Sequence, residues 1–338
     1  IYFTQMVWKG DIMDVYINTD GAKITKEGDT FYIQTKDSSR NLSPQKIKTM
    51  AICARSSITT DAIELAVKNN VDIVLLDSYG MPYGRFWHSK FGSTSKIRRR
   101  QLVIFSSGQG FDMARGWMIE KIDSQIEHLK KLSYKRKPLS DYFERKITDM
   151  NYYRAKIYGE TYQDNLDSVS KIMGYEGNAA KVYYGVISYV IPEEFKFEGR
   201  NTRPAKDPYN AFLNYSFGIL YSKVEKACVI AGLDPYIGVF HSDNYGKKSL
   251  VFDIIERYRY FCWETVFNIF SRKIVNNSHY SSELNSILLT KEGKKLIATS
   301  LAEKLHKKVN YNGRYIENIA VIQYECHNIA NSLLEGED

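Results

Sequence analysis

The stretch from Ser93 to Phe105, Ser-Thr-Ser-Lys-Ile-Arg-Arg-Arg-Gln-Leu-Val-Ile-Phe, marks the point at which the hydrophobic periodicity of the chain changes. Before it, short β-rich runs are separated by turn residues, a pattern typical of strands. From Ser93 onward, apolar residues recur at helical spacing. We therefore expect an α+β protein in which a small β-rich domain, residues 1–90, precedes a larger all-α domain, residues 91–338.

The β-rich part contains several strand patterns and one helix pattern. Alternating or fully apolar runs predict strands at residues 12–17, 30–34, 46–53 and 71–76. A short helix is expected at 61–68, with Thr59 or Thr60 as its N-cap.

The second part is predicted to be helical throughout. Expected helices lie at residues 95–105, 111–132, 139–158, 162–173, 178–189, 208–231, 249–274, 291–308 and 315–334. Asp207-Pro208 marks one start clearly, because Asp is a good N-cap and Pro is favoured at the first helical position. No fixed-period repeat is present.

The segment from Gly232 to Arg259 contains the residues best suited to chemistry. A Gly-Leu-Asp-Pro turn leads into a short apolar run that ends at His241, and a polar loop then reaches Ser249, the expected N-cap of the next helix. Asp253 and Glu256 share one face of that helix. If the loop folds back, these groups can converge on one metal ion. The donor set favours Mg²⁺ or Mn²⁺, although imidazole leaves Zn²⁺ and other transition metals open.

An ordinary structural role is the alternative for the same residues. A single histidine beside an apolar run is often a hydrogen-bonded structural residue. Asp253 and Glu256, which are flanked by Arg257 and Arg259, can also form a solvated, salt-bridged helix face.

Glu176 lies between Gly174 and Gly177, directly before the small residues Ala179 and Ala180. Small residues let helices approach closely, so Glu176 can point into a crowded, shielded space. The alternative is that both glycines separate two helices.

The charge of the chain is moderately basic, with a net charge of +8 and a pI of about 9.0. This balance points weakly to a polyanionic partner. Candidate DNA-binding cations lie in an acid-free stretch and in a basic loop: Arg98, Arg99, Arg100, Arg200, Arg203 and Lys206. A solvated helix face is the alternative for the first three.

The four cysteines are far apart and form no CxxC pair. This spacing argues against a zinc knuckle and a dense disulfide framework, and favours a reducing, cytoplasmic setting. No apolar run approaches the length needed to cross a bilayer, so no membrane association is expected.

Taken together, these segments resemble the Cas1 family, the integrases of CRISPR adaptation. The resemblance rests on four blocks in the family order: Gly-x-Glu-Gly-x-Ala-Ala, Asp-Pro-x-Asn, Gly-Leu-Asp-Pro-x-x-Gly-x-x-His and Ser-Leu-x-x-Asp-x-x-Glu. The matching positions are Gly174, Glu176, Gly177, Ala179, Ala180, Asp207, Pro208, Asn210, Gly232 through His241, Ser249, Leu250, Asp253 and Glu256.

The resemblance implies a site and a reaction. Glu176, His241 and Glu256 would be the ligands of Mg²⁺ or Mn²⁺, with Asp253 in a supporting catalytic role. The implied enzyme is a metal-dependent DNA endonuclease and integrase, which joins the 3′-hydroxyl ends of a protospacer fragment to the CRISPR repeat by transesterification. Such chemistry needs no covalent enzyme intermediate, so the lack of a clear nucleophile constellation is no objection.

The resemblance also implies partners. These are double-stranded DNA, as protospacer and as leader-repeat, and a second copy of the chain bound through the β-rich dimerisation domain. A Cas2 dimer would bridge two such dimers. Two alternatives remain: a casposase-like transposon integrase, for which an added DNA-binding domain would be common, and a non-catalytic DNA-binding scaffold, which would not need Glu176, His241 and Glu256 together.

Overall fold

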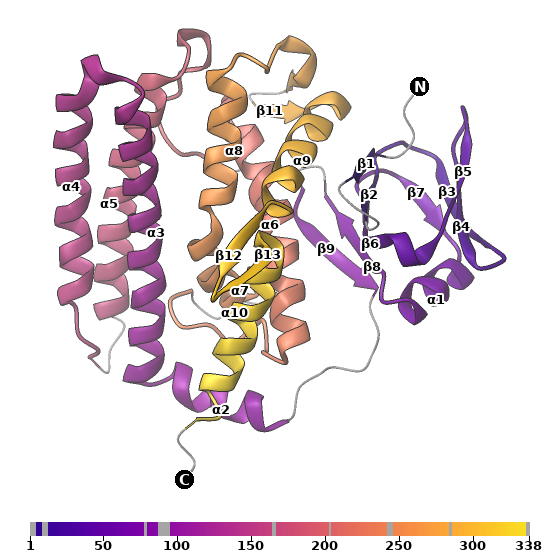
Figure 1. Ribbon diagram of the computed structural model, residues 1–338, viewed down its shortest axis with the longest axis horizontal. Coiled ribbons are helices and arrows are strands. Elements are labelled where there is room, and N and C mark those ends of the chain that lie inside the picture. Colours follow the sequence, from indigo (N-terminus) through magenta and orange to yellow (C-terminus); the bar gives the residue numbers. More distant parts are fainter. Residues whose placement is uncertain are drawn as a thin grey trace.

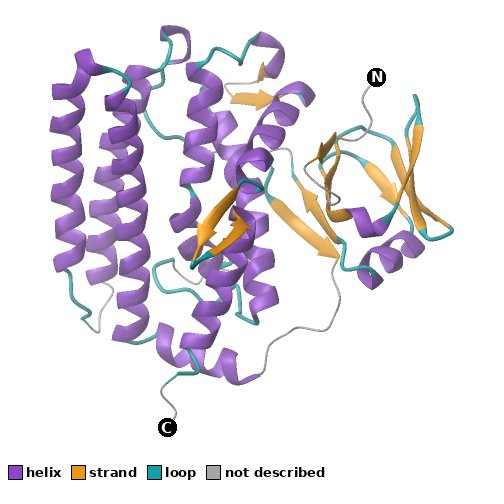
Figure 2. Ribbon diagram, in the orientation of Figure 1, coloured by secondary structure: helices purple, strands orange, loops and turns teal. Residues whose placement is uncertain are grey.

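The computed structural model describes residues 5–8, 13–77, 80–86, 95–163, 167–202, 204–241, 246–283 and 286–335. A β-rich part comes first and a mostly helical part follows, as Figures 1 and 2 show. This arrangement confirms the fold class predicted from the sequence. None of the helices in the described ranges is long and apolar enough to cross a membrane. The four cysteines are not paired in disulfides.

The β-rich part is built from two sheets and helix α1. The five-stranded sheet has the order β1-β2-β6-β8-β9, in which β2, β6 and β8 are parallel, and the four-stranded sheet has the order β5-β4-β3-β7. The elements are β1 Gln5–Trp8, β2 Met13–Ile17, β3 Ala22–Glu27, β4 Thr30–Gln34, β5 Ser39–Leu42, β6 Ile47–Ile52, β7 Ser56–Ile58, α1 Thr60–Lys68, β8 Asp72–Leu76 and β9 Pro82–Phe86.

The five-stranded sheet is covered on both faces. All five residues of β2 are buried. Val15 and Ile17 belong to the core of the β-rich part, whereas Tyr16 belongs to the core formed with the helices. Because successive side chains of a strand point to opposite faces, the sheet contributes one face to each of the two cores.

The helical part surrounds one central helix, α6, which is buried along nearly its whole length. Helices α3, α4 and α5 pack against one another on the side away from the sheets (Figure 1). The elements are α2 Ser95–Phe105, α3 Gly108–Tyr134, α4 Ser140–Gly159, α5 Asp167–Val190, α6 Pro208–Ala231, α7 Ser249–Ile255, the 3₁₀ turn η4 Glu256–Tyr258, α8 Tyr260–Ser271, β10 Tyr280–Glu283, β11 Ser286–Leu289, α9 Lys291–Leu305, β12 Lys308–Tyr311, β13 Arg314–Glu317 and α10 Asn318–Ser332.

Several predicted boundaries differ from the structure. The two helices expected at 162–173 and 178–189 form one helix, α5, which runs through Gly174 and Gly177 without interruption. The single helix expected at 249–274 is broken by η4 into α7 and α8. Ser249 is the first residue of α7 and not its N-cap, a position that Lys248 takes. The antiparallel hairpins β10–β11 and β12–β13 add strands to the part predicted to be all-α.

Two glycines allow the β8–β9 turn to touch helix α6. A Cβ atom on Gly218 would lie 2.2 Å from the carbonyl oxygen of Gly80. Gly80 also has a φ of +84°, a left-handed conformation that glycine adopts readily. The contact therefore needs glycine on both sides, and it fixes the sheet directly against α6.

Charged side chains complete this interface. Lys223 Nζ on α6 donates to Asp14 Oδ2 on β2 at 2.8 Å. Arg85 on β9 lies 3.4 Å from Asp72 on β8 and 3.5 Å from Glu225 on α6. Glu225 in turn pairs with Lys248, the residue before α7, at 2.5 Å. A chain of ion pairs thus links the sheet, α6 and the start of α7.

Candidate active site

Three elements bring charged side chains to one buried point. Lys121 is in the middle of α3, Glu176 is in the middle of α5, and Glu256 is at the junction of α7 and η4. The Lys121 ammonium makes short ion pairs with both carboxylates. Arg259 holds the other oxygen of Glu256, with Nη2 2.7 Å from Oε1. Only 5% of the Lys121 side chain and 14% of the Glu176 side chain is exposed.

These contacts keep the group ionised despite its burial. Burial alone would raise the pKa of Glu256, but Arg259 and Lys121 hold that pKa below its ordinary value. Burial alone would lower the pKa of Lys121, yet the nearby carboxylates of Glu176 and Glu256 raise it. These four side chains, Lys121, Glu176, Glu256 and Arg259, therefore form a compact buried cluster of two cations and two anions.

His241 lies on the segment before α7, and Asp253 of α7 holds its side chain. The imidazole Nδ1 lies 2.6 Å from Asp253 Oδ1. A carboxylate accepts a hydrogen bond, so Nδ1 carries the proton and Nε2 is left with the lone pair. When its ring is protonated, His241 is also close enough to Glu256 to help lower the pKa of that carboxyl. A histidine oriented in this way by a carboxylate is typical of metal ligands.

Asp253 also holds the loop that carries His241. Its fully buried carboxylate accepts hydrogen bonds from the backbone amides of Val239, Phe240 and His241, at 2.6, 3.2 and 3.3 Å. The segment that ends at His241 is thus held against α7, whereas residues 242–245 of the polar loop that follows lie outside the described residues. Gly238 makes this approach possible, since a Cβ there would lie 2.7 Å from Asp253 Oδ2.

The four candidate catalytic residues form two groups. Lys121 brings Glu176 and Glu256 together, and a hydrogen bond joins His241 to Asp253. Within the described ranges, no three His, Cys, Asp or Glu side chains are grouped so that they can hold a metal ion. The donor types nonetheless fit a divalent cation, because two of the three proposed ligands already surround a positive charge. In this structure, the positive charge between the two carboxylates is the ammonium of Lys121.

Two of the cluster's residues, Lys121 and Arg259, are not among the predicted site residues. Lys121 occupies a core-facing position on α3, in register with Ala114, Met118 and Gln125, all of which are buried. A charged residue on an otherwise buried helical stripe is a signal that a partner charge lies opposite. The sequence suggests a solvated, salt-bridged face as one alternative for Arg259, whereas the structure pairs it with the buried carboxylate of Glu256.

The basic loop before α6 lies next to the cluster through Arg200. The guanidinium of Arg200 lies 5.4 Å from the centre of the Phe217 ring, and that of Arg259 lies 4.8 Å from the same ring. Arg200 also donates to Asn210 Oδ1 at 2.9 Å, and burial lowers its pKa. Its side chain thus anchors the loop to α6. Lys206 is exposed, and Arg203 lies outside the described residues.

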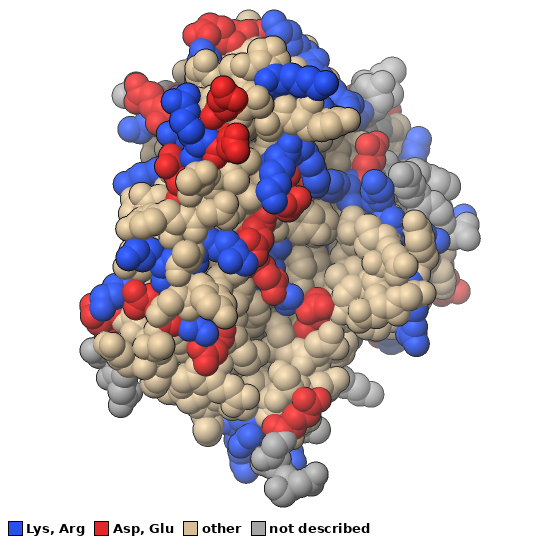
Figure 3. All heavy atoms as spheres, turned by 60° about the vertical axis from the view of Figure 1, so that its left-hand side comes forward, with Lys and Arg blue, Asp and Glu red and all other residues tan. Residues whose placement is uncertain are grey.

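The three arginines of α2 have different surroundings. Arg99 is exposed, whereas Arg98 and Arg100 are half-buried. Arg100 Nε donates to the carbonyl oxygen of Leu333 at 3.1 Å, which ties α2 to the end of α10. Of these three, Arg99 is therefore the most open to solvent. On the face shown in Figure 3, lysine and arginine side chains are interspersed with acidic ones and do not form one continuous positive surface.

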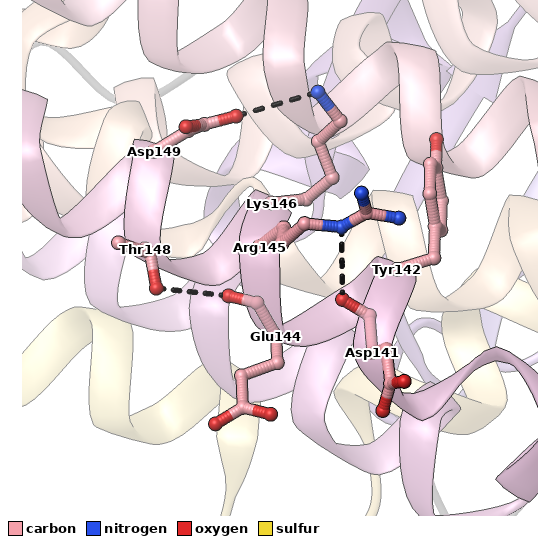
Figure 4. Close-up of a pocket in the computed structure, with 7 residues that line it drawn as sticks. All are labelled: Asp141, Tyr142, Glu144, Arg145, Lys146, Thr148 and Asp149. Atoms are coloured by element: carbon pink, nitrogen blue, oxygen red, sulfur yellow. Dashed lines mark hydrogen bonds and ion pairs between the residues drawn. The ribbon is translucent and has the colours of Figure 1, made fainter.

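A separate pocket on α4 contains none of the candidate residues. It is lined by Asp141, Tyr142, Glu144, Arg145, Lys146, Thr148 and Asp149, as Figure 4 shows. These side chains come from a single helix and bond within it: Lys146 lies 3.3 Å from Asp149, and Thr148 donates to the carbonyl oxygen of Glu144 at 3.0 Å. The pocket therefore lacks the convergent groups that the buried cluster has.

Comparison with known proteins places the sequence in a family. The family model described as CRISPR associated protein Cas1 matches residues 15–303. A CRISPR-associated endonuclease Cas1 of Archaeoglobus fulgidus is 32% identical over 314 residues, which cover 88% of this chain and 89% of the relative. A CRISPR-associated protein Cas1 of Methanobrevibacter ruminantium is 32% identical over 82% of this chain and 84% of its own.

Solved structures agree with the fold. A casposase bound to integration product superposes with a TM-score of 0.81 at 22% identity, over 96% of this chain and 92% of that one. A Cas1 protein from Thermotoga maritima gives a TM-score of 0.80 at 21% identity, over 96% and 98%. The family match extends over most of the sequence and includes the residues that meet in the buried cluster, so the chain belongs to the Cas1 family.

Proposed function

We propose that the chain is a divalent-metal-dependent DNA endonuclease and integrase, which joins the 3′-hydroxyl ends of a protospacer fragment to a CRISPR repeat by transesterification. The observation that carries the proposal is the convergence of Glu176 and Glu256, from separate helices, on one buried positive charge. His241, with its lone pair on Nε2, completes a donor set of two carboxylates and one imidazole. Mg²⁺ or Mn²⁺ is the proposed cofactor.

Each residue of the site has a role in this proposal. A divalent ion bound there would lower the pKa of the attacking hydroxyl and neutralise charge at phosphorus. Glu176, Glu256 and His241 would hold it. Asp253 keeps the proton on Nδ1 of His241 and fixes the loop, so it acts through His241. Arg259 neutralises Glu256 from the other side and so keeps it ionised.

Partners follow from the same proposal. The names of the solved relatives include a casposase bound to integration product and a Cas6-RT-Cas1–Cas2 complex, which supports DNA and Cas2 as partners. We infer that residues 1–90 form a dimerisation domain and residues 91–338 the catalytic domain, with a Cas2 dimer bridging two dimers of this chain. Exposed Arg99 and Lys206 would contribute phosphate contacts, which position a duplex without reading its bases.

A strand-transfer assay tests the proposal. A labelled duplex with 3′-hydroxyl ends is incubated with Mn²⁺ and a plasmid that carries a repeat, and joined product is measured. Glu176→Gln, His241→Ala and Glu256→Gln should abolish joining while circular dichroism still reports a folded protein. Glu264→Gln is the matched control, because 15% of its side chain is exposed and it too pairs with lysines.

Two results would contradict the proposal: full activity in the presence of EDTA, or full activity in all three variants. Joining into any DNA at equal rates, with no preference for the repeat, would instead favour a casposase-like integrase. DNA binding that is unchanged in the three variants, without any joining by the wild type, would favour a non-catalytic scaffold.

A further inference from the structure

Lys121 occupies the position between the two carboxylates that the proposed function assigns to the metal. Its ammonium contacts Glu176 Oε1 and Glu256 Oε2, and its side chain is almost fully buried. Within the described part of the chain, Glu256 Oε2 bonds only to the Lys121 ammonium. If that ammonium leaves, the oxygen is able to accept another cation.

The charges of the cluster are already balanced. Lys121 and Arg259 together carry two positive charges, which match the two carboxylates of Glu176 and Glu256. A divalent ion and the ammonium cannot both occupy the space between these carboxylates, because like charges at contact distance repel strongly in a buried setting. Binding of the ion therefore requires Lys121 to move.

The side chain of lysine is suited to such a movement. It is a compact point charge on a flexible four-carbon stem, and it binds phosphates as well as carboxylates. The cluster is partly open where Glu176 and His241 lie, with 14% and 16% of their side chains exposed. A DNA phosphate that reaches the site from that side offers the displaced ammonium a new partner.

We propose that Lys121 is a displaceable cation that couples metal binding to DNA binding. Without metal, its ammonium holds Glu176 and Glu256 together, and when a divalent ion takes its place the ammonium pairs with a DNA phosphate. The inference rests on the proposed function, and it assigns to Lys121 a positioning role at that site. Since coupling between two ligands is reciprocal, DNA must tighten metal binding by the same factor by which metal tightens DNA binding.

Direct measurement of Mn²⁺ binding tests the inference without relying on activity. Free Mn²⁺ is followed by electron paramagnetic resonance, with and without a duplex whose 3′ ends are dideoxy and cannot be joined. The Glu176→Gln/Glu256→Gln double variant serves as the blank for Mn²⁺ bound elsewhere on protein or DNA. For the wild type, DNA should lower the Kd for Mn²⁺ by about 5- to 150-fold, the usual range of such coupling.

Removing the ammonium should separate the two binding events. In Lys121→Met, the Kd for Mn²⁺ without DNA should fall about tenfold or more, and DNA should no longer change it. Lys223→Met is the matched control, because the Lys223 side chain is also 5% exposed and pairs with a carboxylate away from the site. This control should keep the wild-type Kd for Mn²⁺ and the wild-type effect of DNA.

Equal Mn²⁺ affinity and equal DNA dependence in Lys121→Met and the wild type would overturn the inference and leave Lys121 a structural residue. If Lys121→Met does not fold, the measurement on the wild type is sufficient. A wild-type Kd for Mn²⁺ that DNA leaves unchanged would overturn the coupling. A different failure concerns the proposed function itself. Wild-type protein that binds no more Mn²⁺ than the double variant, with or without DNA, would refute the ligand set.

Discussion

Replacing Asp253 by asparagine should lower the stability of the protein and should also weaken metal binding by His241. Asparagine keeps one carbonyl oxygen, which can still accept from the amides of Val239 and Phe240, and its NH₂ group then faces His241. The two remaining bonds lose the extra strength of an ionised acceptor, about 1 kcal/mol each, and the His241 amide is left without an acceptor at a cost of about 1–3 kcal/mol. The free energy of unfolding should therefore drop by about 3–5 kcal/mol.

The same substitution should change the proton position on His241. An NH₂ group donates to Nδ1, so the imidazole proton moves to Nε2 and that nitrogen can no longer bind a metal. We expect the Kd for Mn²⁺ to rise about 10- to 100-fold, as is usual when a group supporting a ligand is removed. Urea unfolding and Mn²⁺ titration measure the two effects separately.

Asp77→Asn is a suitable control, because Asp77 Oδ1 accepts from the backbone amide of Met81 at 2.8 Å in the β8–β9 turn. It should lose stability but keep the wild-type Kd for Mn²⁺. If Asp253→Asn loses stability and yet binds Mn²⁺ with wild-type affinity, Asp253 serves only the loop, and Nε2 of His241 is not a ligand. Unchanged stability would refute the hydrogen-bond account as a whole.

Three further predictions address other parts of the molecule. Gly218→Ala should lower the free energy of unfolding by about 1–3 kcal/mol or more in urea, because its Cβ meets backbone of the β8–β9 turn, whereas Gly185→Ala, which meets nothing within 4 Å, should be neutral or stabilising. Arg99→Ala should reduce the slope of log K against log salt by about 0.9 for duplex DNA in fluorescence anisotropy, and an unchanged slope would remove α2 from the DNA path. The carboxylate of Asp14, 3.9 Å from Nε2, and that of Glu317, 3.0 Å from Nδ1, raise the pKa of His306 above its ordinary 6.5, so its contribution to stability is present below pH 6.5 and is lost as pH rises through the raised value. The Tm difference between wild type and His306→Asn should shrink over that interval, and a constant difference would contradict this.

Helix boundaries were predictable where local signals agreed with the packing. Helix α6 covers residues 208–231 as predicted, because Asp207 caps it by accepting from the Asn210 amide at 2.7 Å and Pro208 begins it. The break expected at Gly174 and Gly177 is absent, because packing of α5 against α3 and α4 outweighs the weak helix propensity of glycine.

The hairpins in the helical part were missed for a different reason. Strands β10 to β13 have only four residues each, too few to show a clear alternation. One signal was nevertheless present. Asn312-Gly313, between β12 and β13, has positive φ at both residues, 49° and 79°, as a two-residue hairpin turn requires.

The sequence predicts only those candidate site residues that belong to a motif. The motifs predict Glu176, His241, Asp253 and Glu256 as site residues, and their catalytic and metal-binding roles stay predictions. The motifs say nothing of Lys121, because its importance comes from the packing of α3 against α5 and η4, and only tertiary structure shows which charge it meets.

The ion-pair chain from Asp72 through Arg85 and Glu225 to Lys248 has a consequence for chimeric proteins. It ties the β-rich part to the residue that precedes α7, the helix carrying Asp253. A β-rich part transplanted from a relative would bring its own residues at the first two positions and meet this chain's residues at the last two. Where the relative has other residues at these positions, such a graft would leave buried charges unmatched. The four residues should therefore be exchanged together.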